Sequence, residues 1–377
     1  MSNKIDFMKL QDIVTFSQGI QVPVEEQFEK QKDNHVRFLR IVDYTRGDVE
    51  PRYIDDRGSK YAVQSNDVIM IRYGEAGRVV RGYEGVIANN LFKITPNNDC
   101  IDKDFLYYLL TSDTMYKKIA NTTQTTGMPA VNFKNLYRLE ISLPQLKEQK
   151  KIAEILSSVD AAIEKTEQVI AKTEEVKKGL MQQLLTKGIS HTEYKNSELG
   201  EIPLKWEIKQ LKDLLEIKYG KDQKQVICED GKYNILGTGG IIGKTNSYLY
   251  DKPSVLIGRK GTIDNPMYIE EPFWTVDTLF YTVINPNNFE KWIYYAINNI
   301  NLMKYNEATG VPSLSVNNLN TIKFAVPPYD EQVKIVNVLD STEQKIQSEN
   351  LKLNRLMILK QGLMQKLLTG QVRVKVD

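Results

Sequence analysis

The sequence predicts an α+β protein in which two α/β domains are separated by two long helices, and the helices form an antiparallel coiled coil with a pseudo-twofold internal repeat. Three observations support this prediction. Part of the sequence occurs twice. Each copy ends in a long stretch with heptad spacing and no proline. Short β-type runs, separated by glycine, asparagine and proline turns, fill the sequence ahead of each copy.

The repeat is the strongest of these signals. Residues 125–156 align without a gap on residues 308–339, an offset of 183 residues. At the same offset, KGLMQQLLT (178–186) aligns on QGLMQKLLT (361–369). A gap-free match that ends in a nearly identical stretch indicates a duplicated structural unit.

The segments ahead of these copies match more loosely. YGEAGRVV (73–80) resembles IGRKGTID (257–264), and NNLFKI (89–94) resembles DTLFYT (277–282). The order along the chain is therefore variable domain, similar helix, variable domain, similar helix.

The first long helix is expected from Lys147 to Leu185. Apolar or small residues recur there at intervals of three and four, which is the heptad seam of a coiled coil: Ile152, Ile155, Val159, Ala162, Thr166, Val169, Thr173, Val176 and Leu180, widened by Leu156, Ile163 and Ile170. In the second helix, Lys345, Glu349 and Lys352 interrupt a seam of Ile335, Val338, Leu356, Leu359 and Leu363. Helices so long and one-faced need a partner, and each can serve as the other's.

These features divide the chain into five predicted parts: a first domain (1–143), a first repeated helix (144–187), a polar linker (188–203), a second domain (204–326) and a second repeated helix (327–372). Within the domains we expect strands at 68–73, 254–259 and 278–284 and helices at 103–120 and 290–306.

Composition sets limits on function. The 377 residues carry a formal net charge of +2, so charge alone does not indicate nucleic acid. No apolar run approaches the roughly 20 residues that span a bilayer, and the N-terminus lacks a signal sequence, so no membrane partner and a cytoplasmic location are expected. The two cysteines and two histidines lack the spacing of metal ligands, so no metal site is expected.

No catalytic motif is complete. GTGGIIGKTN (237–246) ends like a phosphate-binding loop, but Thr238 stands where the first glycine should be, and turn and strand formers follow instead of a helix. VPPY (326–329) lacks the asparagine of amino-methyltransferases, and YIDDRGSK (53–60) lacks the spacing of a nuclease site. We therefore predict a chain that is not itself an enzyme.

Short motifs recur at fixed places around the two helices. Each helix begins with P-x-x-x-E-Q, in LPQLKEQKKIAEIL and VPPYDEQVKIVNVL, and ends with LMQ-x-LLT. TGMP and TGVP precede the helices, and IPLKWEIKQLKDL opens the second domain. Over essentially the whole chain, this arrangement resembles the specificity subunit of type I restriction–modification systems. The first helix departs from the family pattern, since Gln145 follows Pro144 where the family has two prolines.

The resemblance implies a function. Each variable domain would be a target-recognition domain that reads one half of a split, asymmetric site in double-stranded DNA, and the helices would set the distance between the halves. Two modification subunits would dock on the helices and supply S-adenosylmethionine-dependent methylation. Restriction subunits would supply cleavage driven by ATP with Mg²⁺. This chain would bind none of these cofactors. The alternative, a coiled-coil scaffold without DNA recognition, does not account for two large, divergent domains.

The DNA contacts are expected at turns where glycine lets the backbone approach DNA closely and where Arg, Lys, Asn or Thr can reach bases or phosphates. In the second domain the candidates are Lys244, Thr245, Asn246, Arg259, Lys260 and Thr262. In the first domain they are Arg72, Tyr73, Arg78, Arg81, Asn89 and Asn90.

Overall fold

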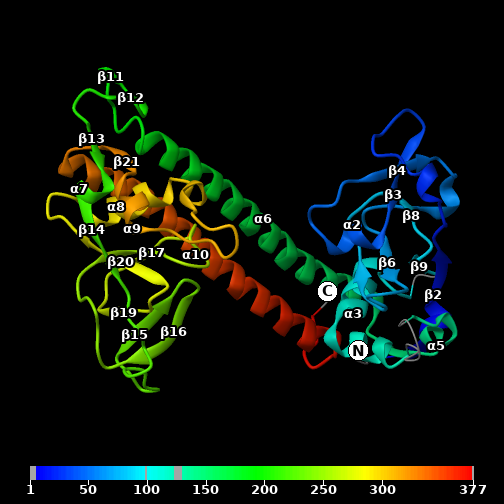
Figure 1. The fold of residues 1–377 in the computed structure, drawn as a ribbon. Coiled ribbons are helices and arrows are strands. Elements are labelled where there is room, and N and C mark those ends of the chain that lie inside the picture. Colours follow the sequence, from blue (N-terminus) through cyan, green and yellow to red (C-terminus); the bar gives the residue numbers. More distant parts are fainter. Residues whose placement is uncertain (1–5, 98–99, 123–129, 376–377) are drawn as a thin grey trace. The chain divides into compact units, whose positions relative to one another are not determined.

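The computed structural model describes residues 6–97, 100–122 and 130–375. It divides into two compact units: unit 1 comprises Met1–Glu167 and Lys352–Asp377, and unit 2 comprises Gln168–Leu351. Two long helices, α6 (Leu146–Leu184) and α10 (Tyr329–Leu368), each contribute one part to unit 1 and the other to unit 2 (Figure 1).

Unit 1 mixes short helices and strands. Its strands are β1 (Asp6–Lys9), β2 (Val14–Gln18), β3 (His35–Leu39), β4 (Arg52–Asp55), β5 (Ala62–Val63), β6 (Val68–Ile71), β7 (Val79–Val80), β8 (Gly85–Ile87), β9 (Leu91–Pro96) and β10 (Glu140–Leu143). Its short helices are α1 (Leu10–Ile13), α2 (Ile41–Thr45), α3 (Lys103–Thr111), α4 (Asp113–Ala120) and α5 (Phe133–Tyr137), with single 3₁₀ turns at Val24–Glu26 and Ser59–Tyr61.

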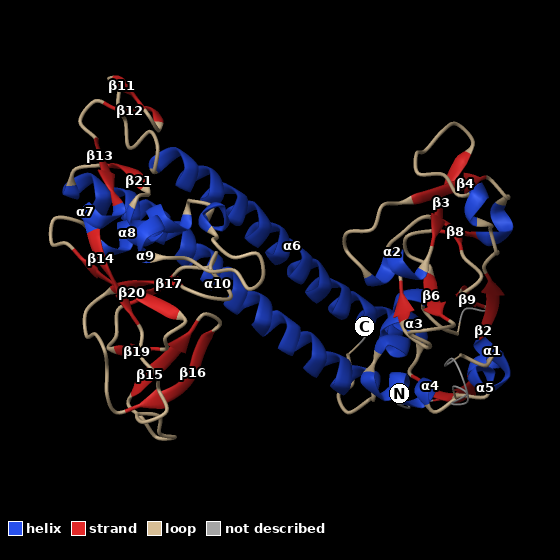
Figure 2. Cartoon of the chain, in the orientation of Figure 1, coloured by secondary structure: helices blue, strands red, loops and turns tan. Residues whose placement is uncertain are grey.

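Unit 2 has the same mixed character (Figure 2). Its strands are β11 (Tyr194–Ser197), β12 (Gly200–Pro203), β13 (Glu207–Gln210), β14 (Leu215–Tyr219), β15 (Tyr233–Gly237), β16 (Gly240–Thr245), β17 (Ser254–Gly258), β18 (Met267–Ile269), β19 (Phe273–Thr275), β20 (Leu279–Ile284) and β21 (Lys323–Val326). Its short helices are α7 (Leu211–Leu214), α8 (Glu290–Asn298) and α9 (Val316–Asn320), with a 3₁₀ turn at Leu302–Tyr305.

The two units share one topology. A four-stranded sheet has the order β2-β9-β6-β7 in unit 1 and β14-β20-β17-β18 in unit 2. A second sheet has the order β4-β3-β8-β5 in unit 1 and β16-β15-β19 in unit 2, and each contains one parallel pair, β3 with β8 and β15 with β19. The pairs β1–β10 and β13–β21 also correspond. The predicted internal repeat is thus confirmed in three dimensions.

The 183-residue offset holds for the elements that lead into the long helices. It relates α5 to α9, β10 to β21 and the start of α6 to the start of α10. The TGVP motif (309–312) lies just ahead of α9, whereas TGMP (126–129) falls outside the described residues.

One looser alignment was wrong by three residues. In the sheets, Ile71 pairs with Leu91 and Gly258 with Leu279, so Arg72 corresponds to Arg259 and not to a residue three positions earlier. At the corrected offset Gly74 corresponds to Gly261, in the turn after β6 and β17, whereas Gly77 and Gly258 have no glycine counterpart. The alignment of 89–94 on 277–282 is correct.

Two predicted helices are shorter than expected because polar side chains interrupt them. Ser112 breaks the segment 103–120 into α3 and α4, and its hydroxyl caps α4 by accepting from the Met115 N–H. The segment 290–306 stops being α-helical at Asn298, and Asn301 caps the 3₁₀ turn that follows. The predicted linker contains the β11–β12 hairpin.

Each unit builds its core on parts of both long helices. In unit 1, Ile152 and Leu156 of α6 and Leu367 and Leu368 of α10 join a core of residues from the sheet β2-β9-β6-β7, from β10 and from α3 to α5. In unit 2, Met181, Leu184 and Leu185 pack in one core with Ile335 and Leu339 of α10. The start of each long helix therefore packs near the end of the other, which is the predicted antiparallel pairing.

The buried seam differs by one position from the predicted one. At every second seam position of α10 the neighbouring residue is the more buried one, which gives a seam of residues 335, 339, 342, 346, 349, 353, 356, 360 and 363. In α6, Leu156 and Lys177 are likewise more buried than Ile155 and Val176. Val176, Val338 and Leu359 of the predicted seam are exposed. The shift also explains the three charged residues that seemed to interrupt the second helix, because only Glu349 lies in the observed seam.

The repeat carries a matching ion pair in each unit. Lys360 of α10 contacts Asp160 of α6 at 2.7 Å in unit 1, and Lys177 of α6 contacts Glu343 of α10 in unit 2. At the repeat offset of 183 residues, Lys177 corresponds to Lys360 and Asp160 corresponds to Glu343. Each unit therefore joins the two helices by the same lysine–carboxylate contact.

A glutamate in the first turn of each long helix holds the segment that follows the other helix. In unit 1, Glu148 accepts two hydrogen bonds from the Arg373 guanidinium (2.8 and 2.6 Å) and one from the Val374 N–H. In unit 2, Glu331 bonds His191 at 2.7 Å and accepts from Trp206 Nε1 at 3.0 Å. This is the glutamate of the repeated P-x-x-x-E-Q motif, so the motif has a structural role.

Replacing Glu148 with glutamine should destabilise unit 1. The hydrogen bonds from Arg373, opposed by burial, hold the pKa of Glu148 below its ordinary value of 4.5. A depressed pKa means that the carboxylate stabilises the fold above pH 4.5, and that this contribution is lost as the pH falls through the folded-state pKa. We expect E148Q to cost about 1–3 kcal/mol at neutral pH and progressively less in acid.

The tryptophans separate the two units in this measurement. Trp206, Trp274 and Trp292 all lie in unit 2, so their fluorescence follows unit 2 while circular dichroism follows both units. Urea unfolding of E148Q should shift the circular-dichroism transition and leave the fluorescence transition in place. E167Q, at an exposed position of the same helix, is the control. An equal effect of the two substitutions would show that the hydrogen bonds of Glu148 with Arg373 and Val374 do not stabilise unit 1.

Candidate nucleic-acid interface

Three turns of unit 2 meet at one place: residues 238–239 between β15 and β16, residues 259–262 after β17, and residues 309–312 ahead of α9. The Gly261 N–H donates to the Pro312 carbonyl at 2.9 Å, and the Leu314 N–H donates to the Arg259 carbonyl at 2.9 Å. A Cβ at Gly261 would lie 3.6 Å from Thr238 Oγ1. Gly261 has a φ of +100°, which favours glycine over other residues.

The segment that resembles a phosphate-binding loop is a β-hairpin. Gly237 pairs with Gly240 across the turn formed by Thr238 and Gly239, and β16 continues to Thr245. A phosphate-binding loop would lead from a strand into the N-terminus of a helix. The segment is instead two antiparallel strands, as the sequence analysis expected.

The exposed candidates of unit 2 lie on this hairpin and the neighbouring turn. Lys244, Lys260 and Thr262 are exposed. In the described part of the chain, neither Lys244 nor Lys260 has an ion-pair partner. The guanidinium of Arg259 is half-buried, donates to the Asp277 carbonyl at 2.7 Å and lies 5.9 Å from the ring centre of the exposed Tyr219. Free ammonium groups beside an arginine and a tyrosine make a surface suited to phosphates and bases.

The other two candidates of unit 2 have their polar groups engaged. Thr245 is fully buried, and its hydroxyl accepts from the Ser247 N–H. The Asn246 amide accepts from the Lys232 N–H and lies 3.5 Å from Cys228 Sγ, to which it donates. Both side chains stabilise the open end of the hairpin.

In unit 1, Arg72 occupies the position of Arg259. Its N–H donates to the Asn90 carbonyl and its carbonyl accepts from the Val131 N–H, as Arg259 does with Thr278 and Leu314. Its guanidinium lies close to two aromatic rings. The guanidinium carbon is 5.0 Å from the ring centre of Tyr73 and 4.8 Å from the ring centre of Phe133. The duplicated backbone thus presents an arginine at the same place in both units.

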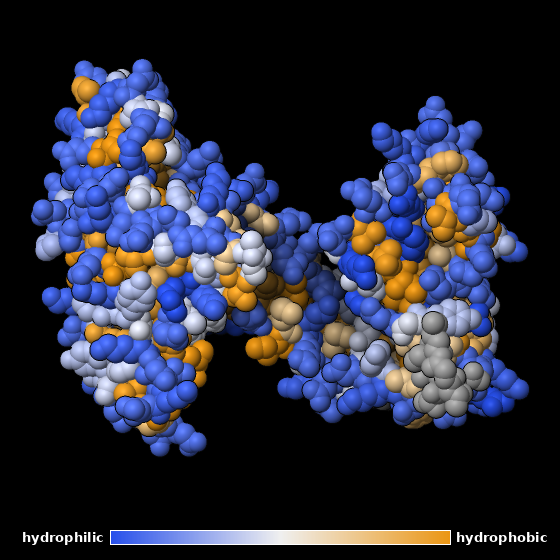
Figure 3. All heavy atoms as spheres, viewed as in Figure 1, coloured by the Kyte–Doolittle hydropathy of each residue, from blue (hydrophilic) through white to orange (hydrophobic). Residues whose placement is uncertain are grey.

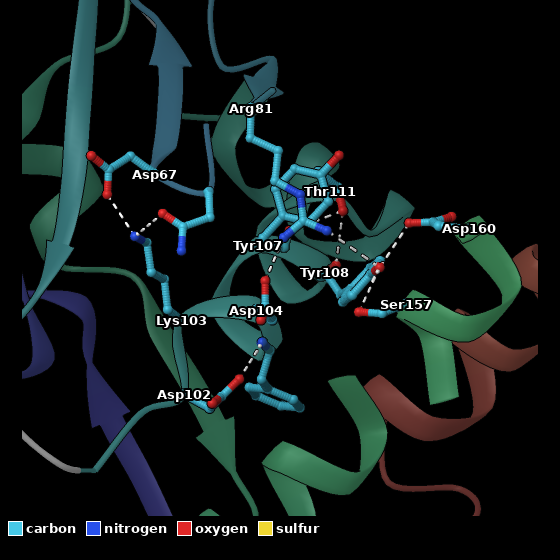
Figure 4. A network of polar contacts seen from close by, with 12 residues as sticks. Asp67, Arg81, Asp102, Lys103, Asp104, Tyr107, Tyr108, Thr111, Ser157 and Asp160 are labelled. Carbon is cyan, nitrogen blue, oxygen red and sulfur yellow. Dashed lines mark hydrogen bonds and ion pairs between the residues drawn. The ribbon is translucent and has the colours of Figure 1, made fainter. Parts of the chain in front are cut away.

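Arg81 belongs to a network of polar contacts that reaches Asp160 of the long helix α6 (Figure 4). It pairs with Asp104 at 2.6 Å, and its guanidinium lies 3.8 Å from the ring centre of Tyr107. It also donates to the Tyr108 hydroxyl at 3.4 Å, which in turn donates to Asp160 of α6 at 2.7 Å. Burial raises the pKa of Tyr108 to about 12. In this conformation Arg81 connects α3 with the long helix.

The remaining candidates of unit 1 differ in availability. Arg78 is exposed and pairs with the exposed Glu75. Asn89 donates to Gln21 at 3.4 Å, and Asn90 keeps a buried side-chain oxygen without a hydrogen-bond partner. Of the first-domain candidates, Arg72, Tyr73 and Asn90 are brought together.

The sequence analysis overlooked a second basic and aromatic cluster in unit 1. The Arg37 guanidinium lies 4.2 Å from the ring centre of Tyr83. Arg37 and Arg40 share the buried carboxylate of Asp43, at 3.7 and 3.0 Å. The spacing of Arg40 and Asp43 at the start of a helix was the only sequence signal, and it does not reveal that Tyr83 lies beside them.

The structure offers no metal centre in residues 6–97, 100–122 and 130–375, where no three His, Cys, Asp or Glu side chains are placed to hold an ion. Across the same residues, no helix is long and apolar enough to cross a membrane.

Comparisons with known proteins define the class. The sequence matches the family of the type I restriction modification DNA specificity domain over residues 3–175 and 203–357. The MjaVIII specificity subunit of a type I restriction enzyme from Methanocaldococcus jannaschii is 28% identical, over 98% of this chain and 93% of that one. The EcoprrI specificity subunit from Escherichia coli is 26% identical, over 64% of this chain and 61% of that one.

Solved structures agree on the fold. The S subunit of a type I restriction–modification system from M. genitalium superposes with a TM-score of 0.68 at 18% identity, covering 100% of this chain and 98% of that one. A chain from a structural study of type I complex assembly superposes with a TM-score of 0.56 at 16% identity, covering 98% of each chain. The chain therefore belongs to the family of type I restriction–modification specificity subunits, with two recognition domains. This assignment favours DNA recognition over the scaffold alternative.

Proposed function

We propose that each recognition domain reads one half of a bipartite, asymmetric site in double-stranded DNA. The observation that carries the proposal is the pair Arg72 and Arg259. The same backbone hydrogen bonds present an arginine in both domains, while the side chains around it differ. One framework with two different surroundings suits two readers of different sequences. Contacts to the DNA phosphates would then position the duplex, and the side chains around each arginine would specify the bases.

The long helices would set the spacer and hold the partners. Several apolar side chains on them face solvent, and Figure 3 shows apolar groups along their exposed side. Val176 of α6 and Leu351, Met357, Ile358 and Leu359 of α10 are about half exposed or more. Two modification subunits would cover such surfaces, one for each half of the internal repeat, since exposed apolar patches mark protein interfaces.

The chemistry would belong to the partners. The modification subunits would bind S-adenosylmethionine and methylate DNA, and the restriction subunits would use ATP and Mg²⁺. This chain would bind none of these cofactors and would contribute recognition and assembly alone.

Substitution of Arg259 tests the reading role. We expect R259A to relax recognition of the half-site read by unit 2, because each lost base contact costs about 1–3 kcal/mol. Methylome sequencing of cells that carry the variant should show a motif degenerate in one half and unchanged in the other. K212A, at an exposed position of the same unit, is the control. Simultaneous degeneration of both halves would show that the domains do not read independently.

A further inference from the structure

The β15–β16 hairpin exposes two neighbouring isoleucines beside the candidate DNA-binding turns. The strand register shifts between Ile235 and Leu236, so that Ile241 pairs with Leu236 and Gly243 with Ile235. Ile242 is the extra residue of a β-bulge, and residues Ile241 and Ile242 are 64% and 50% exposed. A bulge re-aims side chains and commonly lies next to functional sites.

The bulge is supported by the glycines around it. A Cβ at Gly237 would lie 3.3 Å from Ile242 Cγ2, tighter than most packing contacts. A Cβ at Gly243 would lie 3.0 Å from Ile227 Cδ1. A side chain at Gly237 would therefore press on Ile242, and a side chain at Gly243 would press on Ile227.

The surroundings identify DNA as the occupant. Thr238, at the hairpin turn, lies next to Gly261, and Gly261 follows the exposed Lys260. Lys244 follows the isoleucines on the same strand. One acidic residue beside this surface, Asp277, lies 3.7 Å from Arg259 and is paired with it. Two ammonium groups that pair with no carboxylate among the described residues flank the isoleucines, and DNA phosphates have the complementary charge.

We propose that Ile241 and Ile242 form an apolar wedge that enters between base pairs of the half-site read by unit 2 and partly unstacks them. Exposed branched side chains between cationic groups are what such wedges require, because phosphate contacts hold the duplex while the apolar group replaces base stacking. The proposal rests on the proposed function, since it requires that this domain bind DNA.

Unit 1 lacks the wedge. The Ala88 N–H donates to the Leu39 carbonyl as the Val276 N–H does to the Leu236 carbonyl, so Arg40 stands where Gly237 stands in unit 2. Arg40 is the N-cap of α2, and Ile41, the first residue of that helix, packs against the core instead of facing solvent. The distortion is therefore confined to one of the two half-sites.

The test uses the chain purified with its modification subunits. Duplexes carrying the motif found by methylome sequencing would contain 2-aminopurine at successive steps of each half-site. Apart from the base that the modification subunits methylate in each half-site, which would be flipped out of the duplex, the wedge predicts a rise in 2-aminopurine fluorescence at one step of the unit 2 half-site and none in the other half. The double substitution Ile241→Ser, Ile242→Ser should remove this rise and weaken binding by about tenfold.

Two variants serve as controls. The double substitution Ile241→Val, Ile242→Val keeps an apolar wedge and should retain the fluorescence rise. L204S removes an equally exposed aliphatic side chain elsewhere in unit 2 and should change nothing. Unchanged tryptophan fluorescence would show that the serine variant is folded.

The outcomes separate this inference from the proposed function. Loss of all motif binding by the wild-type complex would overturn the function. Motif binding without a fluorescence rise, or a rise that survives the serine substitutions, would overturn the wedge alone. Weaker binding by the serine variant with no rise in the wild type would mean that the isoleucines contact thymine methyl groups, and would also overturn the wedge.

Discussion

Inserting one heptad into each long helix, after Gln168 in α6 and after Leu351 in α10, is expected to lengthen the gap between the two half-sites by about three base pairs. Seven residues add about 10 Å of helix, and each base pair adds about 3.4 Å. The two insertion points lie midway along each helix between the positions of the two repeated ion pairs. An insertion in both helices keeps those contacts and the seam in register.

The methylated motif of cells carrying the extended protein gives the result directly. A three-base-pair change also turns one half-site around the duplex by about a third of a turn, so reduced activity is expected along with the longer gap. Insertion of four residues in each helix is the matched control, because it rotates the seam and unwinds the coil locally. An active seven-residue variant that still methylates the original spacing would show that the helices do not set it.

Replacing Asp340 with alanine should have the largest effect on stability. This carboxylate on α10 accepts from the Tyr295 hydroxyl at 2.7 Å and pairs with Lys291 at 2.8 Å, which fastens α8 to the long helix. The substitution leaves the nearly buried tyrosine hydroxyl and the ammonium without their partner. The ion pair is partly exposed, so we expect a loss of about 2–4 kcal/mol in unit 2.

Tryptophan fluorescence follows this loss, because all three tryptophans lie in unit 2. The fluorescence-detected urea midpoint of D340A should fall well below that of the wild type. The midpoint of Y295F should fall by a smaller amount, because the ion pair of Asp340 with Lys291 remains. E175A, at an exposed position in the part of α6 that belongs to unit 2, is the control. A midpoint for D340A equal to that of the control would mean that α8 is held by apolar packing alone.

Periodicity and repetition predicted most of the architecture. The offset of 183 residues located both long helices and their antiparallel partnership, because a one-faced helix of that length must bury its face. The exact seam could not be read from the first helix. Residue pairs such as Ile155 and Leu156 are apolar at both positions, and only packing against the partner decides which one is buried.

The candidate site was predictable as a set of turns but not residue by residue. Glycine patterns pointed to residues 237–246 and 257–264, and these turns do meet. Whether a basic side chain is free depends on contacts that are distant in sequence. Arg81 meets Asp104 and Tyr108, whereas Lys260 meets no carboxylate in the described residues. The exposed isoleucines escaped notice because a β-bulge is a property of strand pairing and not of local composition.

The way unit 1 is assembled from two separate stretches has a consequence for synthesis on the ribosome. Unit 2 is continuous from Gln168 to Leu351 and is complete before the last part of α10 has been made. The first recognition domain emerges earlier, yet it lacks Leu367 and Leu368 in its core and Arg373 on Glu148 until the end of α10 and the segment after it have been synthesised. The domain whose synthesis begins first is therefore finished last, and its core closes only after unit 2 is complete.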